Sequence, residues 1–187
     1  MNIYFTGSIY FRKDHKDFFE RIVKRAEDLG HTIKADHILD VSMDDIRNKT
    51  LDTSTKYYKK VVKWIGKCDL VIAEMSFPST INIGHEVTMA LEQNKTILAF
   101  HEIGYESVFL KGMDDENFIY LEYDGSNLED VVEEGLEYAK GRQLKRFNLM
   151  LEPELINYLN KLSKKNRKPK SSHIRELIRM DMKKQNN

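Results

Sequence analysis

The segment CDLVIAEM, residues 68–75, is a nearly continuous run of apolar residues. A strand that is buried on both faces has this composition, and such strands lie in the middle of parallel sheets. An amphipathic segment, KYYKKVVKWIGK at 56–67, precedes the run, and a helix-like segment at 85–93 follows it. The run therefore predicts a central parallel strand between two helices.

The same alternation continues in both directions along the chain. Strand patterns lie at 2–9, 31–38, 95–100 and 118–123, and helical patterns lie at 15–30, 105–112 and 127–141. Gly30 is expected to cap the first of these helices. Strands that alternate with helices predict an α/β domain built on a doubly wound parallel sheet. The polar, aperiodic residues 40–55 are expected to form a long loop, which is often functional.

Composition limits the class of protein. Of 187 residues, 41% are hydrophobic and 32% are charged, as in a globular chain, and no apolar run approaches the roughly 20 residues of a membrane helix. The start of the chain lacks the basic region of a signal peptide. The single cysteine, Cys68, excludes an internal disulfide and is expected to be a buried thiol. These features predict a cytoplasmic protein with no membrane partner.

Charge divides the chain into two parts. Residues 142–187 hold 13 Lys and Arg against four Asp and Glu, a net charge of +9, and residues 1–141 carry −9. We therefore expect a first domain over 1–141 and a second, basic domain over 142–187. The basic part suits a polyanion such as DNA, although a solvated basic helix is the alternative.

Small and polar residues follow three of the expected strands. In open α/β sheets, ligands bind beyond the carboxyl ends of the strands, where loop amides and helix N-termini favour phosphate. The candidates for substrate binding there are Gly7, Ser8, Ser79, Thr80, Gly84 and Ser107. Glu86 is expected in the first turn of the helix that follows the central strand. Glu74, at the end of that strand, is expected to face solvent, and a contribution to the site is the alternative. The histidines 31, 37, 85 and 101 lack metal-ligand spacing, and no phosphate-binding P-loop is present, so neither a metal nor a cofactor is expected.

Three motifs together carry a resemblance to a known family. The stretches YFTGSI, KWIGKCDLVIAEMSFPS and IGHE make residues 1–140 similar to the nucleoside 2-deoxyribosyltransferase superfamily, most closely to its 2'-deoxynucleoside 5'-phosphate N-hydrolase branch. The resemblance implies a flavodoxin-like fold and cleavage of an N-glycosidic bond. It implies that Glu86 attacks C1' of the sugar, with Tyr4 as its partner. It assigns phosphate binding to Ser8, Ile9, Ser79 and, from a neighbouring subunit, Ser107.

The chain departs from the family pattern at three places. Val61 stands where the family usually has an Asp that orients the substrate or handles the proton of the base; Asp44, Asp45 or Asp52 could substitute for it. PSTINIGHE is one residue longer than the family motif, so either Ser79 or Thr80 takes the serine role. Residues 10–12, Tyr-Phe-Arg, replace the family's Arg-Gly-Gly and imply a bulkier phosphate loop.

The basic segment resembles the ribbon-helix-helix fold of small repressors across about residues 144–185. RQLKRFNLML (142–151) alternates like a strand, and helical patterns follow at 152–165 and 171–184, with Ser171 or Ser172 as N-cap. The resemblance implies that Arg146, Asn148 and Met150 read DNA bases, and that the second helix holds a phosphate near its N-terminus. A dimerisation module is the alternative. Either interpretation requires at least a homodimer, and a homotetramer is equally open.

Three functions follow from the sequence. The first is hydrolysis of a (deoxy)nucleoside 5'-monophosphate through a covalent glycosyl-Glu86 intermediate. The second is a nucleotide-sensing, DNA-binding regulator with a catalytically weak enzyme-like domain, which Val61 favours. The third is deoxyribosyl transfer between free nucleosides. Tyr57, Tyr58 and Trp64 have helical spacing and are expected to serve in packing rather than in binding a base.

Overall fold

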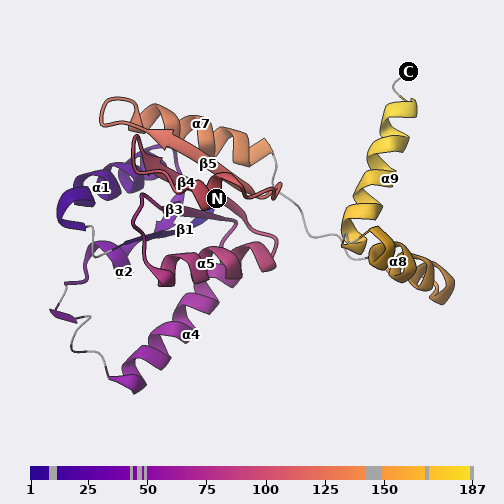
Figure 1. Cartoon of the computed structure of the whole chain (residues 1–187), viewed down its shortest axis with the longest axis horizontal. Helices are drawn as coiled ribbons and strands as arrows, with labels where there is room; N and C mark the ends of the chain where they lie inside the picture. The colour runs from indigo at the N-terminus through magenta and orange to yellow at the C-terminus, as the bar shows by residue number, and fades with distance from the viewer. Residues whose placement is uncertain are drawn as a thin grey trace. The chain divides into compact units, whose positions relative to one another are not determined.

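The computed structural model describes residues 1–8, 12–42, 44–45, 48, 50–141, 149–166 and 169–185. The chain divides into two compact units, Met1–Leu144 and Lys145–Asn187, which are described separately (Figure 1). Among the described residues, no helix combines the length and the apolar character needed to cross a membrane.

The first unit is built on a parallel five-stranded sheet. Its strands are β1 (Asn2–Gly7), β2 (Thr32–Lys34), β3 (Leu70–Glu74), β4 (Thr96–Glu102) and β5 (Phe118–Tyr123). They lie in the order β2-β1-β3-β4-β5, and every neighbouring pair is parallel. This order is that of flavodoxin-like folds, so the predicted fold class is confirmed. From β1 the chain adds β2 on one side and then β3, β4 and β5 on the other, so the topological switch point lies between β1 and β3, and the carboxyl ends of these two strands are the expected ligand site.

Helices cover both faces of the sheet (Figure 1). On one face lie α1 (Arg12–Asp28) and α7 (Leu128–Gly141), and on the other lie α4 (Leu51–Lys67) and α5 (Ile81–Glu92). Two short helices, α2 (Asp36–Leu39) and α6 (Val108–Lys111), follow β2 and β4. Arg21 binds Glu129 through Nε and Nη2 at 2.7 and 2.6 Å, which ties α1 to α7.

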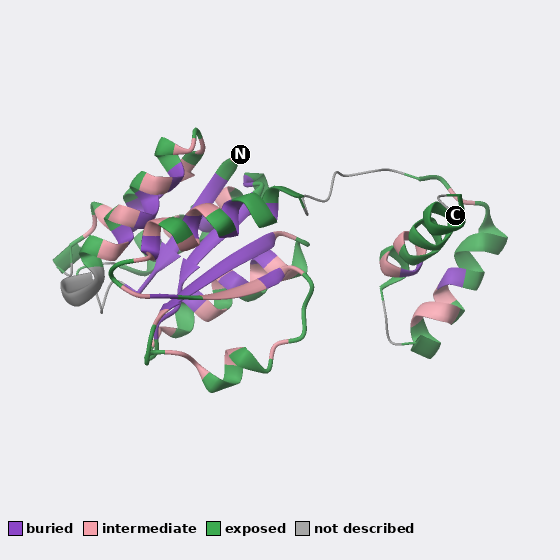
Figure 2. Cartoon of the chain, turned by 90° about the horizontal axis from the view of Figure 1, so that it is seen from above, coloured by how far each residue is buried: buried purple, intermediate pink, exposed green. Residues whose placement is uncertain are grey.

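Two apolar cores lie on opposite faces of the sheet, and the inner strands β1, β3 and β4 between them are mostly buried (Figure 2). In β3, Leu70 and Ile72 pack toward α1 and α7, whereas Val71 and Ala73 pack toward α4 and α5. This division follows from the period of two residues in a strand. All five residues of β3 are buried, so the apolar run at 68–75 does form the central strand that its composition predicts.

The boundaries of several elements differ from the sequence prediction. Strand β2 has three residues, and the second half of the expected strand at 31–38 forms α2 instead. The expected loop at 40–55 ends early, because Thr50 caps α4 by accepting a hydrogen bond from Thr53 N at 3.3 Å. The expected cap at Gly30 is confirmed by its positive φ of 80°.

The second unit contains α8 (Pro153–Asn166) and α9 (Lys170–Gln185), which pack against each other. Both helices were expected from the sequence, and the strand expected before them lies mostly outside the described residues. Leu159 and His173 are buried, whereas seven large apolar side chains of the two helices are between 37% and 59% exposed: Leu155, Ile156, Tyr158, Leu177, Ile178, Met180 and Met182.

Candidate functional site

The candidate site lies at the carboxyl ends of β1 and β3, beside α5. In β1, Tyr4 and Thr6 are two residues apart and therefore point to the same face of the sheet. That face is covered by α5, which contacts both β1 and β3. Glu86 is the sixth residue of α5 and lies in its second turn, not in the first turn as expected, because the helix begins at Ile81, one turn earlier than its apolar pattern indicates.

Glu86 is held by the two side chains of β1. The Tyr4 hydroxyl donates a hydrogen bond to Glu86 Oε2 at 3.0 Å, and the Thr6 side chain also hydrogen-bonds the carboxylate. Tyr4 and Thr6 are almost completely buried. The structure therefore brings together the Glu86 and Tyr4 pair that the family resemblance implies.

His37 is a further member of this group that the sequence analysis left aside. Its Nε2 lies 3.0 Å from the Tyr4 hydroxyl, and the two rings stack with centroids 4.9 Å apart. Because the single phenol proton is donated to Glu86, His37 Nε2 carries a proton and donates to Tyr4. A chain of hydrogen bonds thus runs from His37 through Tyr4 to Glu86. No sequence spacing indicates it, since His37 lies on α2 beyond a short edge strand.

Burial and neighbouring groups shift the pKa values of Glu86 and Tyr4. Burial raises the pKa of Glu86, while the hydrogen bonds from Thr6 and Tyr4 and the charge of His85 partly lower it. Burial, and secondarily the charge of Glu86, raises the pKa of Tyr4 far above that of a free phenol. Tyr4 therefore remains a hydrogen-bond donor, and Glu86 is an acceptor whose carboxylate is only partly solvated.

Two serine hydroxyls that follow β1 and β3 in the chain have no hydrogen-bond partner among the described residues. Ser8 Oγ and Ser79 Oγ are both buried and make no hydrogen bond within the described part of the chain. Buried hydroxyls are nearly always paired in folded proteins, so two orphans at one edge of a sheet indicate a polar ligand. Thr80 is the N-cap residue of α5, and its side chain makes no capping hydrogen bond. The hydroxyls of Ser79 and Thr80 therefore both lie at the positive end of the α5 dipole.

Three other predicted binding residues have different surroundings. Gly7 is small because of packing, since a Cβ there would lie 2.8 Å from Phe19 Cζ, and Gly84 has open space around its Cα. The Ser107 backbone N–H donates to the Tyr120 hydroxyl at 2.9 Å, and its Oγ accepts from Leu110 N at 3.5 Å. Its predicted role in the site of a neighbouring subunit stays a prediction, and Ile9 lies outside the described residues.

Position 61 has an apolar environment. Val61 is 3% exposed and packs in the same core as Tyr4. Two of the suggested substitutes for a carboxylate at this position are engaged elsewhere: Asp52 pairs with Lys56 at 2.6 Å on the surface of α4, and Asp45 binds Ser42. Asp44 is exposed, so within the described residues none of the three suggested carboxylates is seen to replace the missing Asp.

The expectation that Glu74 faces solvent is wrong. Its side chain is 2% exposed, on the face of the sheet opposite Glu86. It accepts hydrogen bonds from Ser76 N at 3.2 Å, from Ser76 Oγ and from the Tyr123 hydroxyl at 3.2 Å. Ser76 Oγ in turn accepts from Glu102 N at 2.9 Å. The buried carboxylate therefore fixes the start of the loop that carries Ser79.

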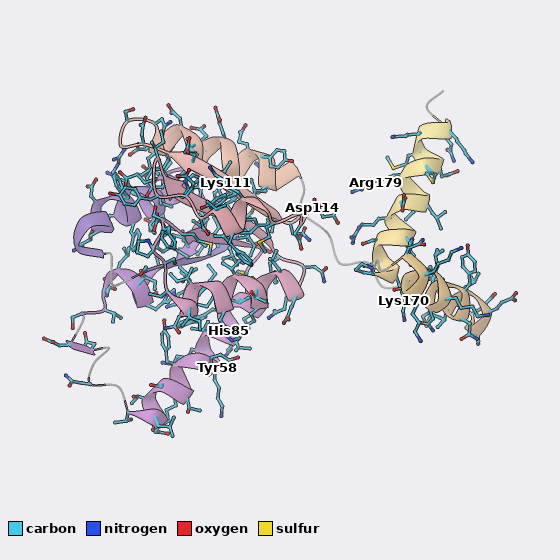
Figure 3. The ribbon with its side chains drawn as sticks, in the orientation of Figure 1. Tyr58, His85, Lys111, Asp114, Lys170 and Arg179 are labelled. Carbon is cyan, nitrogen blue, oxygen red and sulfur yellow. The ribbon has the colours of Figure 1, made fainter. Side chains whose placement is uncertain are left out.

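On the outer side of the site, Tyr58 of α4 lies against His85 of α5 (Figure 3). The rings stack with centroids 5.9 Å apart, and the Tyr58 hydroxyl lies 3.3 Å from His85 Nε2. This contact holds α4 beside α5 next to Glu86. It agrees with the packing role expected for Tyr58.

The candidate DNA-reading residues are only partly described. Arg146 and Asn148 lie outside the described residues, and Met150 is 99% exposed. Ser171 and Ser172 are not N-caps as expected, because α9 already begins at Lys170. Ser172 Oγ instead accepts a hydrogen bond from Arg175 at 3.2 Å.

The fold and the site together define a flavodoxin-like protein with a half-buried, tyrosine-bound glutamate at its topological switch point. The chain belongs to the nucleoside 2-deoxyribosyltransferase family, whose sequence profile matches residues 3–150.

Relatives of known name align in sequence with about the length of the first unit. The 5-hydroxymethyl-dUMP N-hydrolase of Danio rerio is 27% identical over 141 residues, which cover 73% of this chain and 96% of the relative. The enzyme of the same name from Tetraodon nigroviridis is 24% identical over 138 residues, which cover 72% of this chain and 96% of the relative. The structure of the Clostridium botulinum CMP N-glycosidase BcmB superposes with a TM-score of 0.50 at 18% identity, covering 74% of this chain and 98% of BcmB. This last likeness confirms the fold.

Proposed function

We propose that the chain hydrolyses the N-glycosidic bond of a (deoxy)nucleoside 5'-monophosphate, releasing the free base and a sugar 5-phosphate. The observation that carries the proposal is the half-buried Glu86 carboxylate, hydrogen-bonded by Tyr4 and Thr6, at the sheet edge where the hydroxyls of Ser8 and Ser79 have no partners within the described residues. Family membership supports it, as do relatives named as N-hydrolases of a nucleoside monophosphate.

The chemistry takes two steps. A Glu86 oxygen attacks C1' of the sugar, the bond from C1' to the base nitrogen breaks, and its electron pair leaves with the base, which takes a proton from water. A second water then attacks C1' and gives one proton to the hydroxide left by the first, while the bond from C1' to Glu86 breaks and the carboxylate is restored. Tyr4 aims the carboxylate by its bond to Oε2, and burial leaves Glu86 poorly solvated and therefore more nucleophilic.

The 5'-phosphate is placed by the unpartnered hydroxyls. Ser79 and Thr80 directly precede α5, where backbone N–H groups and the helix dipole favour an anion, and Ser8 follows β1 at the same edge of the sheet. A phosphate there satisfies the hydroxyls that the protein itself leaves without partners. The site is therefore expected to prefer nucleotides over nucleosides.

A panel of nucleoside 5'-monophosphates, with the matching nucleosides as controls, tests the proposal by chromatographic measurement of free base. Release from one or more nucleotides, lost in Glu86→Gln, is the expected result. Glutamine keeps the shape of the side chain but is no nucleophile. Release that persists in Glu86→Gln contradicts the assigned role.

The buried Val61 keeps a second candidate function open, a nucleotide-sensing regulator that turns its ligand over poorly. In that case the same panel yields no base, while calorimetry shows tight nucleotide binding. Exchange of bases between two nucleosides would instead identify a deoxyribosyltransferase. The buried Cys68, whose thiol donates to Ile65 O at 3.2 Å, suits the reducing cytoplasm that we propose as the compartment.

We also propose that the second unit pairs with the same unit of another copy. Two helices in 43 residues cannot bury their own apolar side chains, and Leu177 and Ile178 are 58% and 55% exposed. Leu177→Glu is expected to lower the mass measured by light scattering, whereas Lys183→Glu is its control. DNA binding by this basic unit remains part of the proposal; it predicts gel shifts that weaken steeply as salt increases.

A further inference from the structure

Helix α4 brings a second tyrosine to the site. Tyr57, Val61 and Trp64 are spaced by four and three residues and therefore share one face of the helix. The Tyr57 ring lies 6.4 Å from the rings of both His37 and Trp64, measured between centroids, and packs against the core that contains Tyr4. His37 in turn contacts Tyr4, whose hydroxyl donates to Glu86.

Two kinds of side chain come together with Glu86 at this site. Ser8 follows β1 and Ser79 precedes the N-terminus of α5, and both hydroxyls are without partners in the described part of the chain. The rings of His37, Tyr57 and Trp64 form a second group on α2 and α4, which the Tyr4 hydroxyl links to Glu86 through His37. A nucleotide has the same order, since C1' lies between the phosphate and the flat base. With the phosphate at the hydroxyls and C1' at Glu86, the base lies toward the rings.

Tyr57 brings a hydrogen-bond donor to this aromatic group. Val61, one turn further along the helix, offers no polar atom where the family resemblance implies an Asp. Burial raises the pKa of Tyr57 to about 12, and the charges of Glu86 and Asp36 contribute. The phenol therefore keeps its proton at neutral pH and can donate.

We propose, on the basis of the proposed N-glycosidase function, that Tyr57 contacts the leaving base and donates a hydrogen bond to it. As the bond from C1' to the base nitrogen breaks, negative charge spreads to the carbonyl oxygen of the base. The Tyr57 O–H group stabilises that charge without losing its proton, and the base takes its proton from water. A neutral phenol thus performs at position 57 what a carboxylic acid at position 61 would otherwise do.

The test compares leaving groups. kcat and KM are measured for dUMP and 5-fluoro-dUMP, or for dCMP and 5-fluoro-dCMP if cytosine is the preferred base, because fluorine makes the base leave more easily. Tyr57→Phe is expected to lower kcat about 10- to 100-fold for the unsubstituted substrate, the size of one hydrogen bond to a charged group. It should lower kcat much less for the fluorinated one. Equal losses for both substrates, or no loss, overturn the proposal.

The control variant is Tyr138→Phe, which removes a half-exposed phenol from α7 on the other face of the sheet and should leave kcat unchanged. Thermal unfolding confirms that each variant folds. If the wild type releases no base from any nucleotide, the proposed function fails. The contact between Tyr57 and the base is then tested by measuring ligand binding with calorimetry. Weaker binding of dUMP but unchanged binding of deoxyribose 5-phosphate in Tyr57→Phe supports the base contact, and equal binding of dUMP refutes it.

Discussion

Replacing Tyr4 with Phe tests the central geometry of the site. The change removes one oxygen and keeps the buried ring, so no large cavity forms. The lost hydroxyl donates to Glu86 Oε2 and lies opposite His37 Nε2, each at 3.0 Å. A hydrogen bond to a charged group contributes about 1.5–3 kcal/mol and a neutral one about 1 kcal/mol. We therefore expect the free energy of unfolding to fall by about 2–4 kcal/mol.

Activity should fall as well, because Glu86 is then held only by Thr6 and is free to rotate away from C1'. Loss of the charged hydrogen bond alone corresponds to roughly a 10- to 100-fold decrease in kcat. Urea unfolding at pH 7 measures the first effect, and release of free base measures the second. In the double-mutant cycle with Glu86→Gln, the two changes should be non-additive in stability, since they share one contact.

Tyr123→Phe is the matched control. Tyr123 is as deeply buried as Tyr4 and also donates to a buried carboxylate, Glu74 Oε1 at 3.2 Å, but on the opposite face of the sheet. It should destabilise the protein by a comparable amount and leave kcat nearly unchanged. If both variants lose activity in proportion to their stability, the Tyr4 bond has no specific role and the assigned geometry is refuted.

Two further predictions concern pH and packing. Burial raises the pKa of Glu86, so the native protein binds the carboxyl proton more tightly than the unfolded chain does. The stability that this proton contributes is complete below pH about 4.5, the pKa of the unfolded chain, and is lost as the pH rises through the native pKa. Glu86→Gln should therefore become more stable than the wild type as the pH rises toward 7, as measured by urea unfolding. Base release by the wild type should increase over the same pH range, as Glu86 loses its proton. Stability curves of the two proteins that run parallel with pH would contradict this. Gly7→Ala forces a methyl group against the buried Phe19 ring and should destabilise by about 1–3 kcal/mol. Gly66→Ala lies in the last turn of α4, where a Cβ would meet Gln93 Oε1 at an ordinary contact of 3.5 Å, and should stabilise by about 0.5 kcal/mol in the same assay. Equal effects of the two alanines would refute the packing argument.

Much of the architecture could be predicted because its signal is local. The apolar run at 70–74 and the strand at 118–123 appear in the structure where their composition places them. The alternation of strands and helices defines a doubly wound sheet, and such a sheet has one ligand-binding edge. The family motifs then identify Glu86 and Tyr4, which the structure joins at 3.0 Å.

Prediction was wrong where local pattern and three-dimensional environment disagree. The first turn of α5 was missed because Ile81 is 88% exposed, so the helix does not begin with an inward apolar residue. Glu74 was expected in water because carboxylates are rarely buried, but three donors from Ser76 and Tyr123 satisfy it. Tyr123 cannot be identified as a partner from spacing along the chain, since it lies 49 residues from Glu74.

The amino-acid sequence by itself determined the parallel sheet, its ligand-binding edge and the identity of the glutamate, because these depend on periodicity and on motifs of a few residues. Only the tertiary structure decided what surrounds that glutamate: the hydrogen bond from His37 to Tyr4, the unpartnered hydroxyls of Ser8 and Ser79, and the aromatic face of α4 with Tyr57. The physical reason is that hydrogen bonds and burial depend on distances between segments far apart in the chain. Those distances exist only once the strands have paired and the helices have packed against them.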